Sequence, residues 1–83
     1  MSDAAALEAD QTYDGSGLLC PLPVLRANRA LRALAPGQTL KVMATDPAAA
    51  QDFPAYCRQT GHALVATSSE GATLVFIIRK RVD

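Results

Sequence analysis

The hydrophobic positions between residues 23 and 35 recur with the period of an amphipathic helix. The apolar stripe consists of Val24, Ala27, Ala30, Leu31 and Leu34. Three arginines occupy the opposite face: Arg26, Arg29 and Arg32. Leu25 departs from the pattern, because it falls among the arginines and should be exposed. Pro36 and Gly37 follow the last periodic position and predict the end of the helix there.

Four other segments favour β-strands: residues 9–14, 38–45, 63–69 and 73–80. The clearest is 38–45, where Leu40, Val42 and Ala44 alternate with more polar residues, as they do along a strand with one buried face. Apolar residues occupy both faces of 73–80, which is typical of a central strand or of a sheet face that meets a partner.

A second helix is expected between residues 46 and 61. Asp46 is a suitable N-cap residue, with Pro47 at the first helical position. Pro54 argues against one long helix, because it lacks an N–H and clashes with the preceding turn. The sequence therefore predicts a short turn over 47–51, then a helix over 52–60 that Asp52 caps and Gly61 ends.

The element order βαβαββ predicts an α/β fold, a two-layer α/β sandwich with two helices on one face of a four-stranded mixed sheet. One domain is expected over residues 9–83, after a flexible lead-in over residues 1–8. The face of the sheet that carries Met43, Val75 and Ile77 is expected to have no cover within this chain.

Composition narrows the function classes. The 83 residues have a net charge of zero, which argues against non-specific binding to nucleic acid through a bulk positive field. The chain contains neither an apolar run of about 20 residues nor a secretory leader pattern, so a cytoplasmic protein is expected. The two cysteines, Cys20 and Cys57, form neither a zinc motif nor a redox pair, and no metal is expected.

The stretch G-L-L-C-P-L-P-V at residues 17–24 places a cysteine at the predicted start of a helix. Pro21 and Pro23 stiffen the first turn and remove two N–H groups, which leaves those of Leu22 and of Cys20 itself near the sulfur. Because this is the positive end of the helix dipole, a lowered Cys20 pKa is expected. Gly17 is expected to let the preceding loop approach closely. No neighbour in sequence supplies a general base, so Cys20 is expected to be a thiol that reacts with a partner protein and not a self-sufficient catalytic site.

The string D-x-x-G-x-x-C-P-x-P, here Asp14, Gly17, Cys20, Pro21 and Pro23, resembles the signature of the TusA (SirA-like) sulfur carrier family. Further similarity covers nearly the whole chain from residue 10, including T-D-P at 45–47, D-F-P-A-Y-C at 52–57 and I-R-K at 78–80. The resemblance implies a βαβαββ fold and a persulfide on Cys20, with no other cofactor.

The resemblance also implies partners. A cysteine desulfurase, or a rhodanese-like or DsrE-type sulfurtransferase, would load Cys20, and an acceptor protein would receive the sulfur. The protein would act as a persulfide carrier with these enzymes, as a monomer, rather than as a stand-alone catalyst. Destinations in the family are tRNA thiolation, molybdenum cofactor synthesis and sulfur oxidation.

Two leucines depart from the family pattern. Leu22 replaces a glutamate that tRNA-thiolation members usually have, and Leu19 stands where a basic residue is common. Docking of a partner is expected on a surface that contains Leu19, Leu25, Arg26 and Arg29. Leu22 is a supporting residue of the motif, and with Leu19 it is expected to bear on which partner receives the sulfur.

Alternatives remain open from the residues alone. Cys20 is also compatible with a structural role in an interaction module that uses the open sheet face, or with a peroxide-sensing thiol resolved by Cys57. A buried packing role is the favoured interpretation of Cys57, and a turn or packing role that of His62. The basic run at 79–81 is compatible with contact to a partner, but direct binding of nucleic acid is not expected.

Overall fold

The computed structural model describes residues 9–82. Its elements, in chain order, are β1 (Gln11–Gly15), α2 (Leu22–Arg32), β2 (Thr39–Ala44), α3 (Ala49–Thr60), β3 (Ala63–Glu70) and β4 (Thr73–Arg79). The predicted βαβαββ order is confirmed, with element ends shifted by a few residues. The expected lead-in over residues 1–8 lies outside the described residues.

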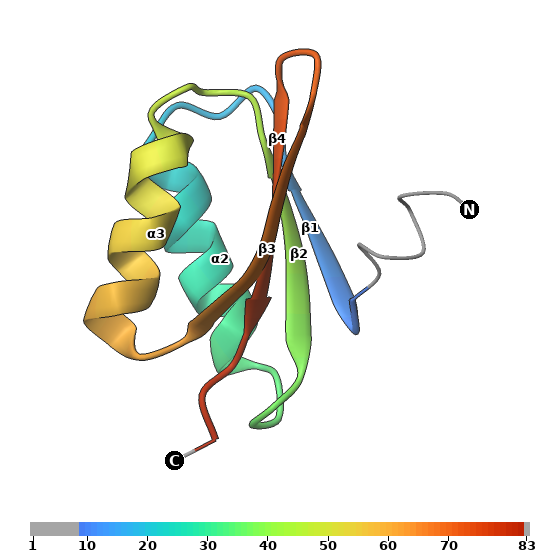
Figure 1. The fold of residues 1–83 in the computed structure, drawn as a ribbon, viewed down its shortest axis with the longest axis vertical. Helices are drawn as coiled ribbons and strands as arrows, with labels where there is room; N and C mark the ends of the chain where they lie inside the picture. The colour runs from blue at the N-terminus through green and yellow to red at the C-terminus, as the bar shows by residue number, and fades with distance from the viewer. Residues whose placement is uncertain (1–8, 83) are drawn as a thin grey trace.

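The sheet has the strand order β1-β2-β4-β3. β1 and β2 are parallel and are joined through α2, whereas β4 pairs antiparallel with both β2 and β3. Both helices cover the same face of this mixed sheet (Figure 1). The predicted two-layer α/β sandwich is therefore confirmed. The loops that lead into α2 and α3 lie together at one end of the molecule.

The core lies between the helices and the sheet. Ala27 and Leu31 of α2 are fully buried, as the periodicity predicts, and Phe53 of α3 stacks on Phe76 of β4 with ring centroids 4.7 Å apart. The two helices are also joined by a hydrogen bond from the Tyr56 hydroxyl to Asn28 Oδ1, 2.8 Å long. The packing fixes how the starts of α2 and α3 lie relative to each other.

The predicted start of the second helix is wrong. α3 begins at Ala49 and contains Pro54, whereas the sequence predicted a helix from residue 52 with Asp52 as its cap. Pro54 removes one N–H that would bond to the carbonyl of Ala50, and Ala50 is exposed, so water can satisfy that carbonyl. Gly61 ends the helix as expected, in the left-handed conformation with φ +85°.

As expected, no helix of residues 9–82 covers the other face of the sheet (Figure 1), but the apolar residues of β4 on that face are not open to solvent. Val75 and Ile77 of β4 are only 5% and 3% exposed, and Ala9, Met43 and Ala66 pack against them. β4 is a central strand, so side chains from β2 and β3 shield it from both sides. The interaction-module alternative loses the open apolar face on which it depended. Within residues 9–82, no helix is long and apolar enough to cross a membrane.

Candidate functional site

Cys20 lies in the loop between β1 and α2, at the end of the molecule where both helices begin (Figure 1). The loop is tied to the one before α3 by two hydrogen bonds. The N–H of Cys20 donates to Asp46 Oδ2 over 2.9 Å, and the N–H of Gly17 donates to Thr45 Oγ1 over 2.9 Å. Tertiary contacts therefore set the position of the cysteine, whose thiol is free and partly buried.

The start of α2 differs from the expected helix start. Its first helical residue is Leu22, Pro21 occupies the capping position, and the Cys20–Pro21 peptide bond is cis. The N–H of Leu22 donates to the carbonyl of Leu19 over 2.9 Å, and that of Cys20 is bound by Asp46. Both N–H groups expected to face the sulfur are therefore already satisfied.

The expected lowering of the Cys20 pKa is also wrong. Burial, a hydrogen bond from the thiol to the Asp52 side chain and the charges of Asp46 and Asp52 raise the pKa of Cys20 to about 11. Each of these effects disfavours a negative charge on the sulfur. Burial is the largest of these effects, and the two carboxylates add to it because they lie beside the thiol, while the N–H groups of Leu22 and Cys20 donate to other acceptors.

Asp46 and Asp52 lie beside the Cys20 thiol, whereas the sequence assigned them only to helix caps. Asp46 Oδ1 accepts a hydrogen bond from the N–H of Ala48 over 3.0 Å, in the turn before α3. The expected capping role of Asp46 is wrong, because Ala48 occupies the capping position of that helix. The N–H groups of Ala48 and Cys20 hold the pKa of Asp46 below its usual value. The missed signal is tertiary, because both residues are more than 25 positions from Cys20.

The other motif residues shape the approach to Cys20. Asp14, near the end of β1, accepts a hydrogen bond at Oδ1 from the N–H of Ser16 in the turn that follows the strand. Gly17 has φ +82°, but an added Cβ would meet nothing within 4 Å. Glycine is therefore required there for its backbone conformation and not for the close approach that the sequence suggested. Pro23 is buried under the loop.

Three large apolar residues lie near Cys20 in the sequence and have exposed side chains. Their exposed fractions are 72% for Leu19, 42% for Leu22 and 58% for Leu25. Arg26 and Arg29 are exposed on the same helix, as the periodicity predicts. A shallow groove of about 250 Å³ runs between the helices on the side of Pro21 and Asp52. We call the exposed surface beside Cys20 the apolar collar; it consists of Leu19, Leu22, Leu25, Arg26 and Arg29.

Comparison with known proteins decides the family. Residues 11–80 match the family described as sulfurtransferase TusA. The chain belongs to the TusA family. This family and the sandwich fold agree with the resemblance found in the sequence.

Relatives in the TusA family cover most of the chain. A sulfur carrier protein TusA from Allochromatium vinosum is 49% identical over 71 residues, which are 86% of this chain and 93% of the relative. One from Pseudomonas syringae is 42% identical over 94% of this chain and 93% of the relative. A SirA-like protein from Desulfitobacterium hafniense has the same fold, with a TM-score of 0.76 at 23% identity, covering 86% of this chain and 97% of that one.

The remaining candidates from the sequence lie apart from the Cys20 loop or inside the core. Cys57 is 5% exposed in the core, where burial raises the pKa of its thiol, so the predicted packing role is confirmed. Both cysteines are free thiols. His62 lies after α3 and lines a different pocket (described below). Among the described residues, no cluster of three or more His, Cys, Asp or Glu side chains is arranged to hold a metal ion.

Proposed function

We propose that this protein is a sulfur carrier that accepts a sulfane sulfur as a persulfide on Cys20 and relays it to an acceptor protein. The observation that supports this most is the partly exposed, free Cys20 thiol at the end of a TusA-family domain. The names of the relatives support the carrier class. A cysteine desulfurase, or a rhodanese-like or DsrE-type sulfurtransferase, is the proposed donor.

The loading step is a thiol–persulfide exchange. Cys20 loses its proton, and its sulfur attacks the terminal sulfur of the donor's cysteine persulfide. The donor's S–S bond breaks, its electron pair stays on the donor cysteine as a thiolate, and a new S–S bond forms on Cys20. Oxidation states are exchanged between the two cysteines, so the step needs no external oxidant. Delivery to the acceptor repeats the exchange in the opposite direction.

The carboxylates beside Cys20 determine where this exchange takes place. At neutral pH the raised pKa keeps the free carrier's thiol protonated, and a protonated thiol is a poor nucleophile. Docking on a donor must therefore supply the base or positive charge that removes the proton. This arrangement restricts sulfur uptake to a partner's active site.

We expect the protein to gain one sulfur atom when it is incubated with a cysteine desulfurase and free cysteine, or with a persulfidated sulfurtransferase. Intact-mass spectrometry would detect the adduct, and dithiothreitol should remove it because a persulfide is reducible. An unchanged mass with donors of both classes would contradict the proposal. A catalytically dead desulfurase is the matched control, since it should transfer nothing.

The apolar collar is proposed as the docking surface for the donor. Exposed leucines around a reactive atom can be buried in a complex, and the arginines at their rim can steer an acidic partner. Leu19→Ser is expected to lower the rate of loading by roughly fivefold, as truncation of a moderate interface contact does. Val82→Ser is the control, because Val82 is exposed to nearly the same extent, 74% against 72%, but lies after β4. Equal rates for the two variants would exclude this surface.

A further inference from the structure

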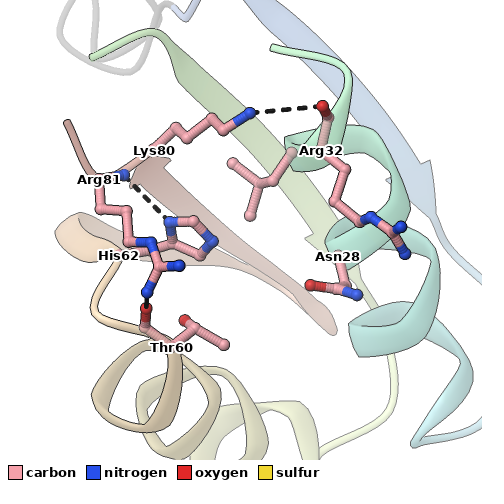
Figure 2. Close-up of a pocket in the computed structure, with 7 residues that line it drawn as sticks. Asn28, Arg32, Thr60, His62, Lys80 and Arg81 are labelled. Atoms are coloured by element: carbon pink, nitrogen blue, oxygen red, sulfur yellow. Dashed lines mark hydrogen bonds between the residues drawn. The ribbon is translucent and has the colours of Figure 1, made fainter. Parts of the chain in front are cut away.

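A polar pocket of about 240 Å³ lies between the C-terminal ends of the helices and the segment after β4. Its floor is the buried side chain of Leu31. Polar and basic side chains form its walls: Asn28, Arg32, Thr60, His62, Lys80 and Arg81. Figure 2 shows Asn28 and Arg32 on the side of α2, with His62 and Arg81 facing them from the other side. None of the lining residues is acidic.

Hydrogen bonds fix which of these groups can donate into the pocket. His62 Nδ1 accepts the N–H of Arg81 over 3.1 Å, so the neutral ring carries its proton on Nε2 and remains a donor there. Burial and the charges of Arg81 and Lys80 hold the pKa of His62 below its usual value, which favours this neutral form. Tyr56 also flanks the ring, at 5.8 Å between centroids, and limits its rotation.

Lys80 keeps one donor that its hydrogen bonds do not use. Lys80 Nζ donates to the carbonyls of Arg32 and Leu34, which uses two of its three hydrogens. Arg81 donates to the carbonyl of Thr60 over 2.7 Å. These bonds offset the negative ends of the two helix dipoles, which would otherwise oppose an anion here. The backbone carbonyl of Arg32 accepts the bond from Lys80, but no interaction of the Arg32 side chain is found within residues 9–82. Its guanidinium is turned away from His62 (Figure 2), so a rotation about its unrestrained side-chain bonds brings it to a ligand in the pocket.

We propose that this pocket binds a small oxyanion, a phosphate or sulfate group, between the Arg32 guanidinium, His62 Nε2–H and the Lys80 ammonium. Its volume is below the roughly 300 Å³ at which sites for whole drug-sized molecules begin, so a single oxyanion suits it better than a complete nucleotide. Guanidinium and ammonium groups with no carboxylate among the lining residues match the charge of such a ligand.

The proposed anion pocket is separate from the sulfur site. It lies at the C-terminal end of α2, whereas Cys20 precedes the N-terminal end, and the 11 residues of α2 span about 16 Å. The acidic residues that restrain Cys20, Asp46 and Asp52, are likewise absent from its walls. Binding here therefore does not depend on the proposed carrier function, and either proposal can fail alone.

The test is a titration of ¹⁵N-labelled protein with sodium phosphate, with chloride adjusted to hold the ionic strength constant. We expect saturable shifts of the His62 and Lys80 amides and the Arg32 side-chain signal, with millimolar affinity. Arg32→Gln should weaken binding about tenfold, the worth of one charge-assisted hydrogen bond. Arg58→Gln is the matched control, because Arg58 is an exposed arginine in the last turn of α3 and does not line the pocket. The affinity of this variant for phosphate should equal that of the wild-type protein.

A second titration with a short single-stranded oligouridylate identifies the source of the oxyanion. Tighter binding than inorganic phosphate, still weakened by Arg32→Gln, would assign the pocket to a phosphodiester. Equal or weaker binding would assign it to the free ion. Shifts that do not saturate, or equal losses in Arg32→Gln and Arg58→Gln, would overturn the proposal, because both indicate non-specific attraction to positive charge.

Discussion

The Cys20→Ser variant is expected to gain no sulfur from any donor that loads the wild-type protein. Serine preserves the size of the side chain and leaves the backbone N–H in place to bond with Asp46, so the loop should keep its conformation. Its hydroxyl cannot form a persulfide. Intact-mass spectrometry after incubation with donor should therefore show the adduct falling to the background of the unloaded protein.

Cys57→Ser supplies the matched control, because it removes the other thiol of the same chain. Cys57 is buried in the core, so its loss should reduce stability but leave the extent of loading at the wild-type level. Circular dichroism would verify that both variants are folded. Loading of Cys20→Ser to the wild-type extent, or loss of loading only in Cys57→Ser, would place the carried sulfur elsewhere.

The Cys20 thiol is expected to react slowly with iodoacetamide at neutral pH and to titrate near pH 11, in a Cys57→Ser background that isolates it. The thiolate is the reactive form, so the alkylation rate follows its population. Compared with a cysteine of ordinary pKa, 9.0, Cys20 should be alkylated about a hundredfold more slowly at pH 7.5, because each unit of pKa lowers the thiolate population tenfold. Rates measured from pH 7 to 11.5 would give the midpoint.

Neutralising the carboxylates should reverse part of this effect. Asp52→Asn removes a negative charge beside the sulfur and is expected to raise the alkylation rate at pH 8 by about tenfold, with Asp46→Asn acting in the same direction. The titration midpoint of Cys20 should stay above the ordinary cysteine pKa of 9.0, because burial is the largest cause of the raised pKa. Glu70→Gln makes the same charge change at the β3–β4 turn, away from Cys20, and should have no effect. A wild-type midpoint at or below 9 would refute the role given to both carboxylates.

The fold was predictable from local patterns because each of its elements has a clear period or a clear stop. The stripe through Ala27 and Leu31 identifies α2, and Gly61 ends α3 because left-handed backbone favours glycine. The start of α3 was not predictable, since the first turn depends on the exposed Ala50 carbonyl, which needs no partner within the protein. The buried face of β4 depends on strand order, which the sequence does not state.

The candidate site was predictable in its central residue but not in its electrostatics. The motif identifies Cys20, and the exposure of Leu25 follows from the helical period. Asp46 and Asp52 reach the thiol only after α3 packs beside α2, so a pattern confined to neighbouring positions misses them. The same limit applies to the anion pocket, whose residues come from three separate parts of the chain.

The place of Cys20, partly buried beside Asp52 and Asp46, links its ionisation to the thermodynamics of folding. A group whose pKa is raised in the native state contributes stability that is present below its unfolded pKa and is lost as pH rises through its native pKa. For Cys20 that window runs from about 9 to about 11. Under the proposed function, the same rule extends to an ionised persulfide on this sulfur, whose charge the unfolded chain would tolerate better than the folded one. Such a cargo would weaken the native state that carries it, and a partner that neutralises the charge on docking would stabilise both the complex and the fold.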